Sequence, residues 1–133
     1  EAPAPVCMPI LCEPPGPINH STLEHSGSNG EFPYPSEANH TCHPGYTTTG
    51  SARGPTRIVR RCQATGVFEE AGQCRPVECG VPPAAAHADY EGRALVYNES
   101  VTYECRAGHT MSGVAGAPNR TVLTCGAAGA FEG

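Results

Sequence analysis

Short runs of β-branched and aromatic residues alternate with turn-forming residues along the chain. The segment ALVYNESVTYEC (94–105) carries valines and tyrosines typical of strands, on both sides of a turn-like Asn-Glu-Ser. RIVRRC (57–62) and RTVLTC (120–125) are β-branched runs that each enter a cysteine, whereas the polar segment 21–40 predicts a long loop. No segment sustains an apolar i, i+3, i+4, i+7 pattern over three turns, so the pattern predicts an all-β fold of short strands without helices.

Part of this pattern occurs twice. Residues 45–70 recur 63 positions later as residues 108–133, and the intervals Cys42 to Cys62 and Cys105 to Cys125 have the same length. Matches at a fixed offset without insertions indicate an internal repeat. Upstream, the CEPP that starts at Cys12 aligns with the CGVPP that starts at residue 79, and the loops that follow differ in length, as surface loops do. The sequence therefore predicts two small tandem modules.

The eight cysteines divide between the repeats, with four in the first and three in the second: Cys12, Cys42, Cys62 and Cys74, then Cys79, Cys105 and Cys125. We expect a fourth cysteine for the second repeat shortly beyond residue 133. Four residues separate Cys7 from Cys12, as four separate Cys74 from Cys79, so Cys7 is expected to close a module that lies upstream.

These spacings predict the tail of a preceding module and a linker at 1–11, a first module at 12–74 and a linker at 75–78. A second module follows at 79–133, truncated before its fourth cysteine. The alternative is that all eight cysteines pair within the chain, which would require Cys7 to bond to Cys105.

Composition supports small stapled modules in an extracellular setting. Apolar residues make up 38% of the chain and aromatic residues 6%, which is thin material for one large core. The cysteine content is typical of a secreted or cell-surface disulfide scaffold. The net charge of −5 argues against a nucleic-acid partner, and no apolar run is long enough for a membrane span.

Side chains that could catalyse a reaction or bind a metal are sparse. Structural zinc sites need closely spaced ligand pairs, and the nearest cysteines have four residues between them. His40 and His43 flank Cys42, but in a strand they would face opposite ways. Asp89 is the only aspartate, and there is no Gly-x-Ser-x-Gly, GxGxxG or P-loop motif. We therefore expect no catalytic residues, metal or other cofactor.

One basic cluster and four sequons are the candidate binding and modification sites. Arg57, Arg60 and Arg61 could dock a sulfated glycan or an acidic partner, although Arg60 points away from the other two in a strand. Because the chain is acidic overall, we favour a solvated face for this cluster. Candidate glycan acceptors begin the N-x-S/T triplets at Asn19, Asn39, Asn98 and Asn119, of which the last two lie in predicted turns or loops.

The second repeat contains the CGVPP opening, a VTYEC followed by Gly108, a glycine at 113 and a cysteine before a Gly-x-Phe. In this combination it resembles a complement control protein module, also called a sushi domain or short consensus repeat. The four-cysteine count and the short linkers of the chain match that family as well. Two departures are Phe68 and Phe131, which stand where the family usually has Trp. A third is in the first repeat, which has His40 at the position where the second repeat has Tyr103.

The resemblance implies elongated, β-sandwich-like modules in which the first cysteine pairs with the third and the second with the fourth. The implied disulfides are Cys12–Cys62, Cys42–Cys74 and Cys79–Cys125, with Cys7 and Cys105 bonded to cysteines outside this segment.

The predicted function is non-enzymatic recognition or adhesion, in which a semi-rigid extracellular array binds a protein partner. Linkers of four residues, one with Pro9 and the other with Pro76, would limit the tilt between modules. The alternatives are a structural subunit or spacer within a larger complex, and accessory modules of a secreted enzyme or complement-type regulator. The fold alone does not decide between them.

Overall fold

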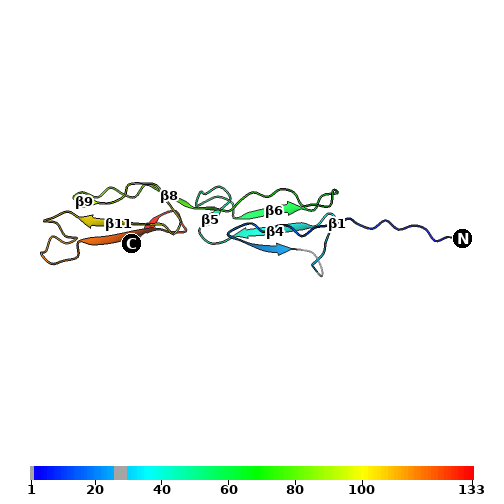
Figure 1. The fold of residues 1–133 in the computed structure, drawn as a ribbon, viewed down its shortest axis with the longest axis horizontal. Coiled ribbons are helices and arrows are strands. Elements are labelled where there is room, and N and C mark those ends of the chain that lie inside the picture. Colours follow the sequence, from blue (N-terminus) through cyan, green and yellow to red (C-terminus); the bar gives the residue numbers. More distant parts are fainter. Residues whose placement is uncertain (1, 26–29) are drawn as a thin grey trace.

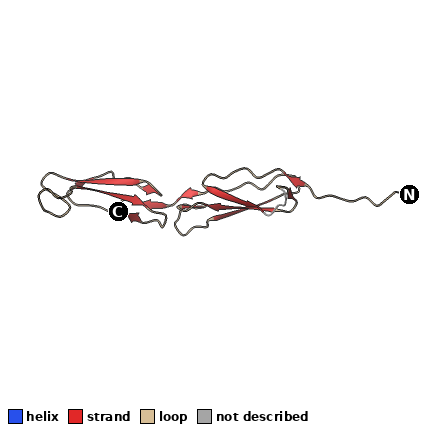
Figure 2. Cartoon of the chain, turned by 90° about the horizontal axis from the view of Figure 1, so that it is seen from below, coloured by secondary structure: helices blue, strands red, loops and turns tan. Residues whose placement is uncertain are grey.

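The structure, a computed structural model, describes residues 2–25 and 30–133. Two strand-rich bodies follow one another end to end, and the first residues extend away from them as a tail (Figure 1). All the regular secondary structure of the described residues is β-strand, and the strands run mainly along the long axis (Figure 2). We call residues 12–74 module 1 and residues 79–133 module 2.

Module 1 is built on an antiparallel sheet in the order β2-β4-β6, from the strands Ser21–His25, Glu37–Cys42 and Arg57–Arg61. A short pair at the N-terminal end joins β1 (Leu11–Cys12) to β3 (Phe32–Pro33). A second short pair at the other end joins β5 (Tyr46–Thr47) to β7 (Arg75–Pro76), so the predicted linker begins inside a strand.

Module 2 is built on an antiparallel sheet in the order β13-β12-β11-β9. Its strands are Phe131–Glu132, Arg120–Cys125, Ser100–Cys105 and Ala88–Asp89. A separate short pair joins β8 (Glu78–Gly80) to β10 (Leu95–Val96). This pair occupies the same place in module 2 as β1 and β3 occupy in module 1.

The predicted all-β fold is confirmed, and the β-branched runs form strands where the sequence placed them. RIVRR forms β6 and leads into Cys62, RTVLTC forms β12, and the segment 94–105 forms β10 and β11 around Asn98, whose φ is +72°. The prediction of a long loop over 21–40 was wrong where the structure describes it, because Ser21–His25, Phe32–Pro33 and Glu37–Cys42 are strands, and residues 26–29 of that loop lie outside the described residues. Ser21–His25 pairs along its whole length with β4, and backbone hydrogen bonds rather than apolar side chains define this edge strand.

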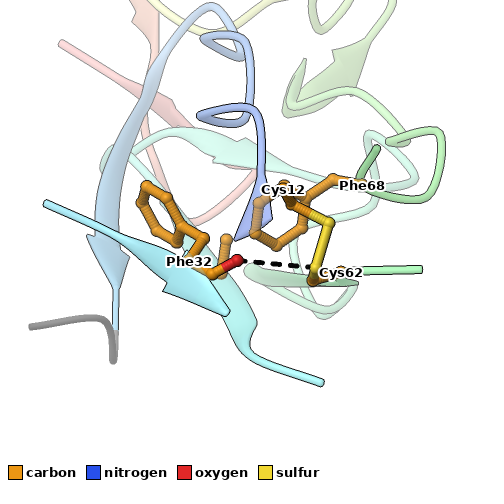
Figure 3. Close-up of a cluster of buried hydrophobic side chains, with 5 residues drawn as sticks. Cys12, Phe32, Cys62 and Phe68 are labelled. Atoms are coloured by element: carbon orange, nitrogen blue, oxygen red, sulfur yellow. Dashed lines mark hydrogen bonds between the residues drawn. A yellow bond between two sulfur atoms is a disulfide. The ribbon is translucent and has the colours of Figure 1, made fainter. Parts of the chain in front are cut away.

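The core of module 1 is small and centred on a disulfide. Cys12, Phe32, Ala38, Cys62 and Phe68 form one buried cluster. The rings of Phe32 and Phe68 meet edge to face, with centroids 5.3 Å apart, beside the Cys12–Cys62 bond (Figure 3). Phe68 is only 7% exposed, so the phenylalanine that replaces the expected tryptophan fills the core without an indole N–H to satisfy.

Module 2 has an equivalent core around Leu95, Val101, Tyr103 and Cys125, with Phe131 packed against it. The Tyr103 hydroxyl donates a hydrogen bond to the Pro83 carbonyl oxygen over 2.7 Å. Burial of this ring raises the pKa of Tyr103. The tyrosine thus fills the core and satisfies its polar end.

Module 1 has a histidine, His40, where module 2 has this tyrosine. Solvent reaches 0% of His40, and neither ring nitrogen has a hydrogen-bond partner among the described residues. Burial, and secondarily the positive charge of Arg60, hold the pKa of His40 below its usual value. The core of module 1 therefore accepts this imidazole in its neutral form.

Acid should destabilise module 1 through His40. Below the usual imidazole pKa of about 6.5, the unfolded chain binds a proton that the folded module excludes, so stability is lost as the pH falls. Replacing His40 with phenylalanine should flatten the dependence of the melting temperature on pH between about 7 and 5. His43→Gln, at an exposed histidine, is the matched control and should retain the wild-type dependence. An unchanged acid sensitivity in His40→Phe would contradict this account.

Candidate functional site

The cysteines define the frame of both modules. Disulfides join Cys12 to Cys62, Cys42 to Cys74 and Cys79 to Cys125, with Cα–Cα distances of 5.8, 5.7 and 5.8 Å. These are the pairs that the family resemblance implies. Two thiols remain, Cys7 in the exposed tail and the half-buried Cys105. Cys105 lies on the wall of a largely apolar groove of about 370 Å³, with its sulfur 3.7 Å from the Met111 sulfur.

The backbone runs from module 1 into module 2 through a hydrogen-bonded joint. The Val77 N–H donates to the Gly45 carbonyl of module 1 over 2.8 Å. The Val77 carbonyl accepts from the Tyr97 N–H of module 2 over 2.7 Å. The Glu78 N–H donates to the Gly50 carbonyl over 2.9 Å. The linker therefore bonds to a loop on each side of it.

Side chains close the same joint. Val77 is 1% exposed, and the Tyr97 ring packs edge-on against the Tyr46 ring at 5.7 Å between centroids. Gly45, at a φ of +89°, lies so close to Tyr97 that a Cβ there would be 2.4 Å from the ring. On the other side Gly129 approaches Ala52, where an added Cβ would be 2.9 Å from the alanine methyl.

This joint is the feature of the site that sequence analysis did not find. The short linker predicted limited tilt, but it gave no sign that Tyr97 and Gly129 of the second module contact the first. Gly45 and Gly108 are equivalent in the repeat, yet only Gly45 is buried, so the repeat by itself could not reveal the contact.

The predicted arginine cluster is divided in the structure. The Arg60 guanidinium donates to the backbone carbonyls of Glu69 and Gly16, at 2.9 and 3.1 Å. Arg61 pairs with Glu37 at 3.2 Å, and its backbone N–H donates to a carboxylate oxygen of Glu69. Both side chains are thus engaged within module 1.

Arg57 of the predicted cluster and two other arginines of module 1, Arg53 and Arg75, have uncommitted guanidinium groups. Among the described residues, these three guanidinium groups make no ion pair or hydrogen bond, and Arg53 bonds to the Ser51 hydroxyl only through its backbone N–H. Arg53 lies beside Ala52 at the joint, Arg75 lies in β7, and Arg57 starts β6 opposite Thr41, next to Cys42. In module 2 the arginines pair with carboxylates: Arg93 with Glu91 and Glu99, Arg106 with Asp89, and Arg120 with Glu104.

A groove of about 640 Å³ lies on module 1 near this end. Its walls are the loop from Gly16 to His20, the side chain of Arg60 and the segment 71–76. The imidazole of His20 stacks on Tyr46 with ring centroids 4.1 Å apart, which connects the groove wall to the joint. The groove therefore offers a cationic surface, with Arg75 at its end nearest module 2.

The four sequon asparagines differ in their settings. Asn19, Asn98 and Asn119 are exposed and lie outside the strands. Asn39 is half-buried in the central strand β4, paired with Glu24 on one side and Val59 on the other. Glycosylation of all four stays a prediction, and the surroundings favour the three exposed asparagines.

Nowhere in the described chain do three histidine, cysteine or acidic side chains gather as they would around a metal ion. No stretch of the described residues forms an apolar helix of membrane-spanning length.

Comparison with known proteins gives one family and several relatives. The family model described as Sushi repeat (SCR repeat) matches residues 12–74 and 79–133. The chain is 34% identical over 111 residues to rat "Sushi, von Willebrand factor type A, EGF and pentraxin domain-containing protein 1", covering 83% of the chain and 3% of that protein. It is 28% identical to rat C4b-binding protein alpha chain, covering 80% of the chain and 19% of the relative.

Mouse complement receptor type 2 is a further relative, 28% identical over 140 residues, which cover 96% of the chain and 13% of the receptor. The chain thus spans only a small part of the length of these relatives.

The contact between Gly45 and Tyr97 can be tested with a matched pair of substitutions. Alanine at a left-handed backbone position costs roughly 1–2 kcal/mol. Both Gly45→Ala and Gly108→Ala should therefore lower the free energy of unfolding by that amount. Gly108 has a φ of +86° but has nothing within 4 Å of an added Cβ. Gly45→Ala should therefore lose about 1–3 kcal/mol more, because its Cβ displaces the Tyr97 ring. Urea denaturation measures the difference, and equal losses in the two variants would contradict the packed joint.

Proposed function

The chain belongs to the Sushi repeat family, and from that premise we propose that it is a segment of an extracellular array that recognises a protein partner. The partner is a protein with an acidic surface, which contacts the end of module 1 next to the joint. The observation that carries this proposal is the set of uncommitted arginines there, Arg53, Arg57 and Arg75.

The joint supports a role in recognition. Because Val77 is buried and its N–H and carbonyl bond to opposite modules, the two modules present their surfaces in one fixed arrangement. A preorganised surface loses less conformational entropy on binding than a flexible one. The names of two relatives, C4b-binding protein and complement receptor type 2, describe proteins that bind a partner, which agrees with this role.

The charges support a partner that carries a local acidic patch and is not strongly negative overall. The chain has a net charge of −5, so a partner with a strong overall negative charge would be repelled. The free guanidinium groups at one end of module 1 make the surface there positive, although the chain as a whole is negative. Arginine is well suited to bidentate contacts with carboxylates at interfaces.

The disulfides support an extracellular location, because such bonds persist in oxidising compartments. In the array, Cys7 is the last cysteine of a preceding module, and Cys105 pairs with a cysteine beyond residue 133. Glycans at the exposed sequons would leave the cationic end of module 1 as a bare surface, except at Asn19 on the rim of the groove.

Two triple variants of the full-length protein test the proposal. Arg53→Gln, Arg57→Gln and Arg75→Gln together should slow association with the partner at low salt and weaken binding by one or more orders of magnitude. The control combines Arg93→Gln, Arg106→Gln and Arg120→Gln, which removes the same charge from module 2 and should bind as wild type. Surface plasmon resonance against a panel of purified extracellular proteins, C4b included, provides the measurement.

Two results would overturn the proposal. One is that the control triple weakens protein binding as much as the module 1 triple. The other is that no protein of the panel binds, while the chain purifies only with other subunits or binds only heparin, which would favour an assembly role or a sulfated-glycan ligand.

A further inference from the structure

The groove on module 1 is built from three wall segments that are tied in place. The walls are the loop 16–20, the Arg60 side chain and the segment 71–76, and they border a space of about 640 Å³. The Arg60 guanidinium donates to the Gly16 carbonyl over 3.1 Å and to the Glu69 carbonyl over 2.9 Å. The disulfide from Cys42 to Cys74 anchors the third wall. The groove is therefore a fixed feature of module 1.

Two of the walls leave backbone groups open to a ligand. Gly16 and Gly72 have nothing within 4 Å of an added Cβ, and glycine permits a ligand to approach the backbone closely. Among the described residues, no group accepts a hydrogen bond from the N–H of Gly72 or Gln73, and both residues are exposed. The segment 71–76 thus offers backbone donors to a ligand that is rich in oxygen.

The groove also has an apolar side. Pro17, Ile18 and Pro76 line it, and Ile18 and Pro76 are half-buried. A sugar ring has oxygens around its edge and C–H groups on its faces. Hydrogen-bond donors next to aliphatic surface therefore suit such a ring, because its oxygens keep partners while its faces leave the water.

One residue of the walls, Asn19, is itself a candidate for glycan attachment. It begins the sequon Asn19-His20-Ser21 and is exposed. The turn that carries it is held on both sides. The Ser21 hydroxyl donates to the Ile18 carbonyl over 2.6 Å, and the His43 N–H donates to the His20 carbonyl over 2.8 Å. Asn19 is therefore a fixed point in the groove wall.

The other three sequon asparagines lie away from the groove. Asn98 has a φ of +72° between β10 and β11, Asn119 directly precedes β12, and Asn39 lies within β4. None of these three belongs to the groove walls. Asn19 is thus the sequon asparagine that adjoins a cavity with donors and apolar surface.

We propose that Asn19 carries an N-linked glycan and that the first N-acetylglucosamine of this glycan lies in the groove of module 1. The inference rests on the extracellular location in the proposed function, because the glycan is added in the secretory pathway. In the transfer, Nδ2 of Asn19 attacks the anomeric carbon of a lipid-linked oligosaccharide diphosphate. The new N–C bond forms as the C–O bond to the diphosphate breaks, Nδ2 loses one proton, and the lipid diphosphate leaves.

The attached sugar bridges two walls of the groove. Its acetamido and hydroxyl oxygens accept from the N–H groups of Gly72 and Gln73, and its C–H groups cover Pro17 and Pro76. A ligand on a short tether reaches an effective concentration of the order of millimolar, so contacts too weak to hold a free sugar are sufficient. The sugar therefore shields the segment 71–76 from solvent and holds it to the loop 16–20.

Hydrogen–deuterium exchange tests this position in the full-length protein, produced in a eukaryotic secretory host that adds high-mannose glycans. Because the Gly72 and Gln73 amides are exposed and unbonded, their exchange should approach that of an unfolded chain when the groove is empty. In the glycoprotein it should be several-fold slower. Asn19→Gln should lose this protection, whereas Asn119→Gln, which removes an exposed sequon of module 2, should keep it.

Enzymatic trimming of the folded glycoprotein is a second test that needs no substitution. Endoglycosidase H removes a high-mannose glycan except for its first N-acetylglucosamine, so trimming should preserve the slow exchange. Exchange as fast in the glycoprotein as in Asn19→Gln would overturn the inference. Protection that disappears on trimming would also overturn it, because the outer sugars would then be the ones that cover the segment.

Glycopeptide mapping of the same samples separates this inference from the proposed function. If Asn98 and Asn119 carry glycans but Asn19 does not, the extracellular location stands and the inference fails. If no asparagine carries a glycan, the inference fails as well, and the arginine variants still decide whether module 1 binds a protein partner.

Discussion

The backbone of Val77 belongs to both modules at once, since its N–H bonds to Gly45 and its carbonyl accepts from Tyr97 while its side chain is buried. Swivelling one module against the other would break at least one of these bonds and expose the valine. A buried backbone group left without a partner costs about 1–3 kcal/mol, so the arrangement resists bending. The packed glycines at positions 45 and 129 add to this, because they let the loops of the two modules approach closely.

Such a joint needs modules that hold their loops in place with little core. The buried cluster of module 1 has five residues, two of which are the bonded Cys12 and Cys62. Closing loops of 50, 32 and 46 residues contributes about 4 kcal/mol for each disulfide in the chain-entropy model. The disulfides therefore make each module more rigid than an apolar interior of this size could. The joint then fixes the orientation of one rigid module relative to the other.

The sequence predicted the features that repeat or alternate. The internal repeat, the all-β class and the strands β6, β11 and β12 follow from fixed spacings and from β-branched runs that enter cysteines. It failed at Ser21–His25, because Thr22, Leu23 and Glu24 are all exposed and show no alternation of buried and exposed positions, so pairing with β4 defines this edge strand. It also grouped Arg57, Arg60 and Arg61, whereas the contacts of Arg60 and Arg61 with Gly16, Glu37 and Glu69 depend on the folded loops. The contact of Tyr97 with Gly45 joins distant parts of the chain and leaves no local signal.

The central claim is that the two modules move as one body. Residual dipolar couplings of backbone N–H bonds, measured in a weakly aligned sample of the chain, report the orientation of each module separately. The account predicts that a single alignment tensor fits the couplings of β4 and β6 in module 1 together with those of β11 and β12 in module 2. Two tensors of clearly different magnitude would show that the modules reorient independently, and would contradict the joint at Val77.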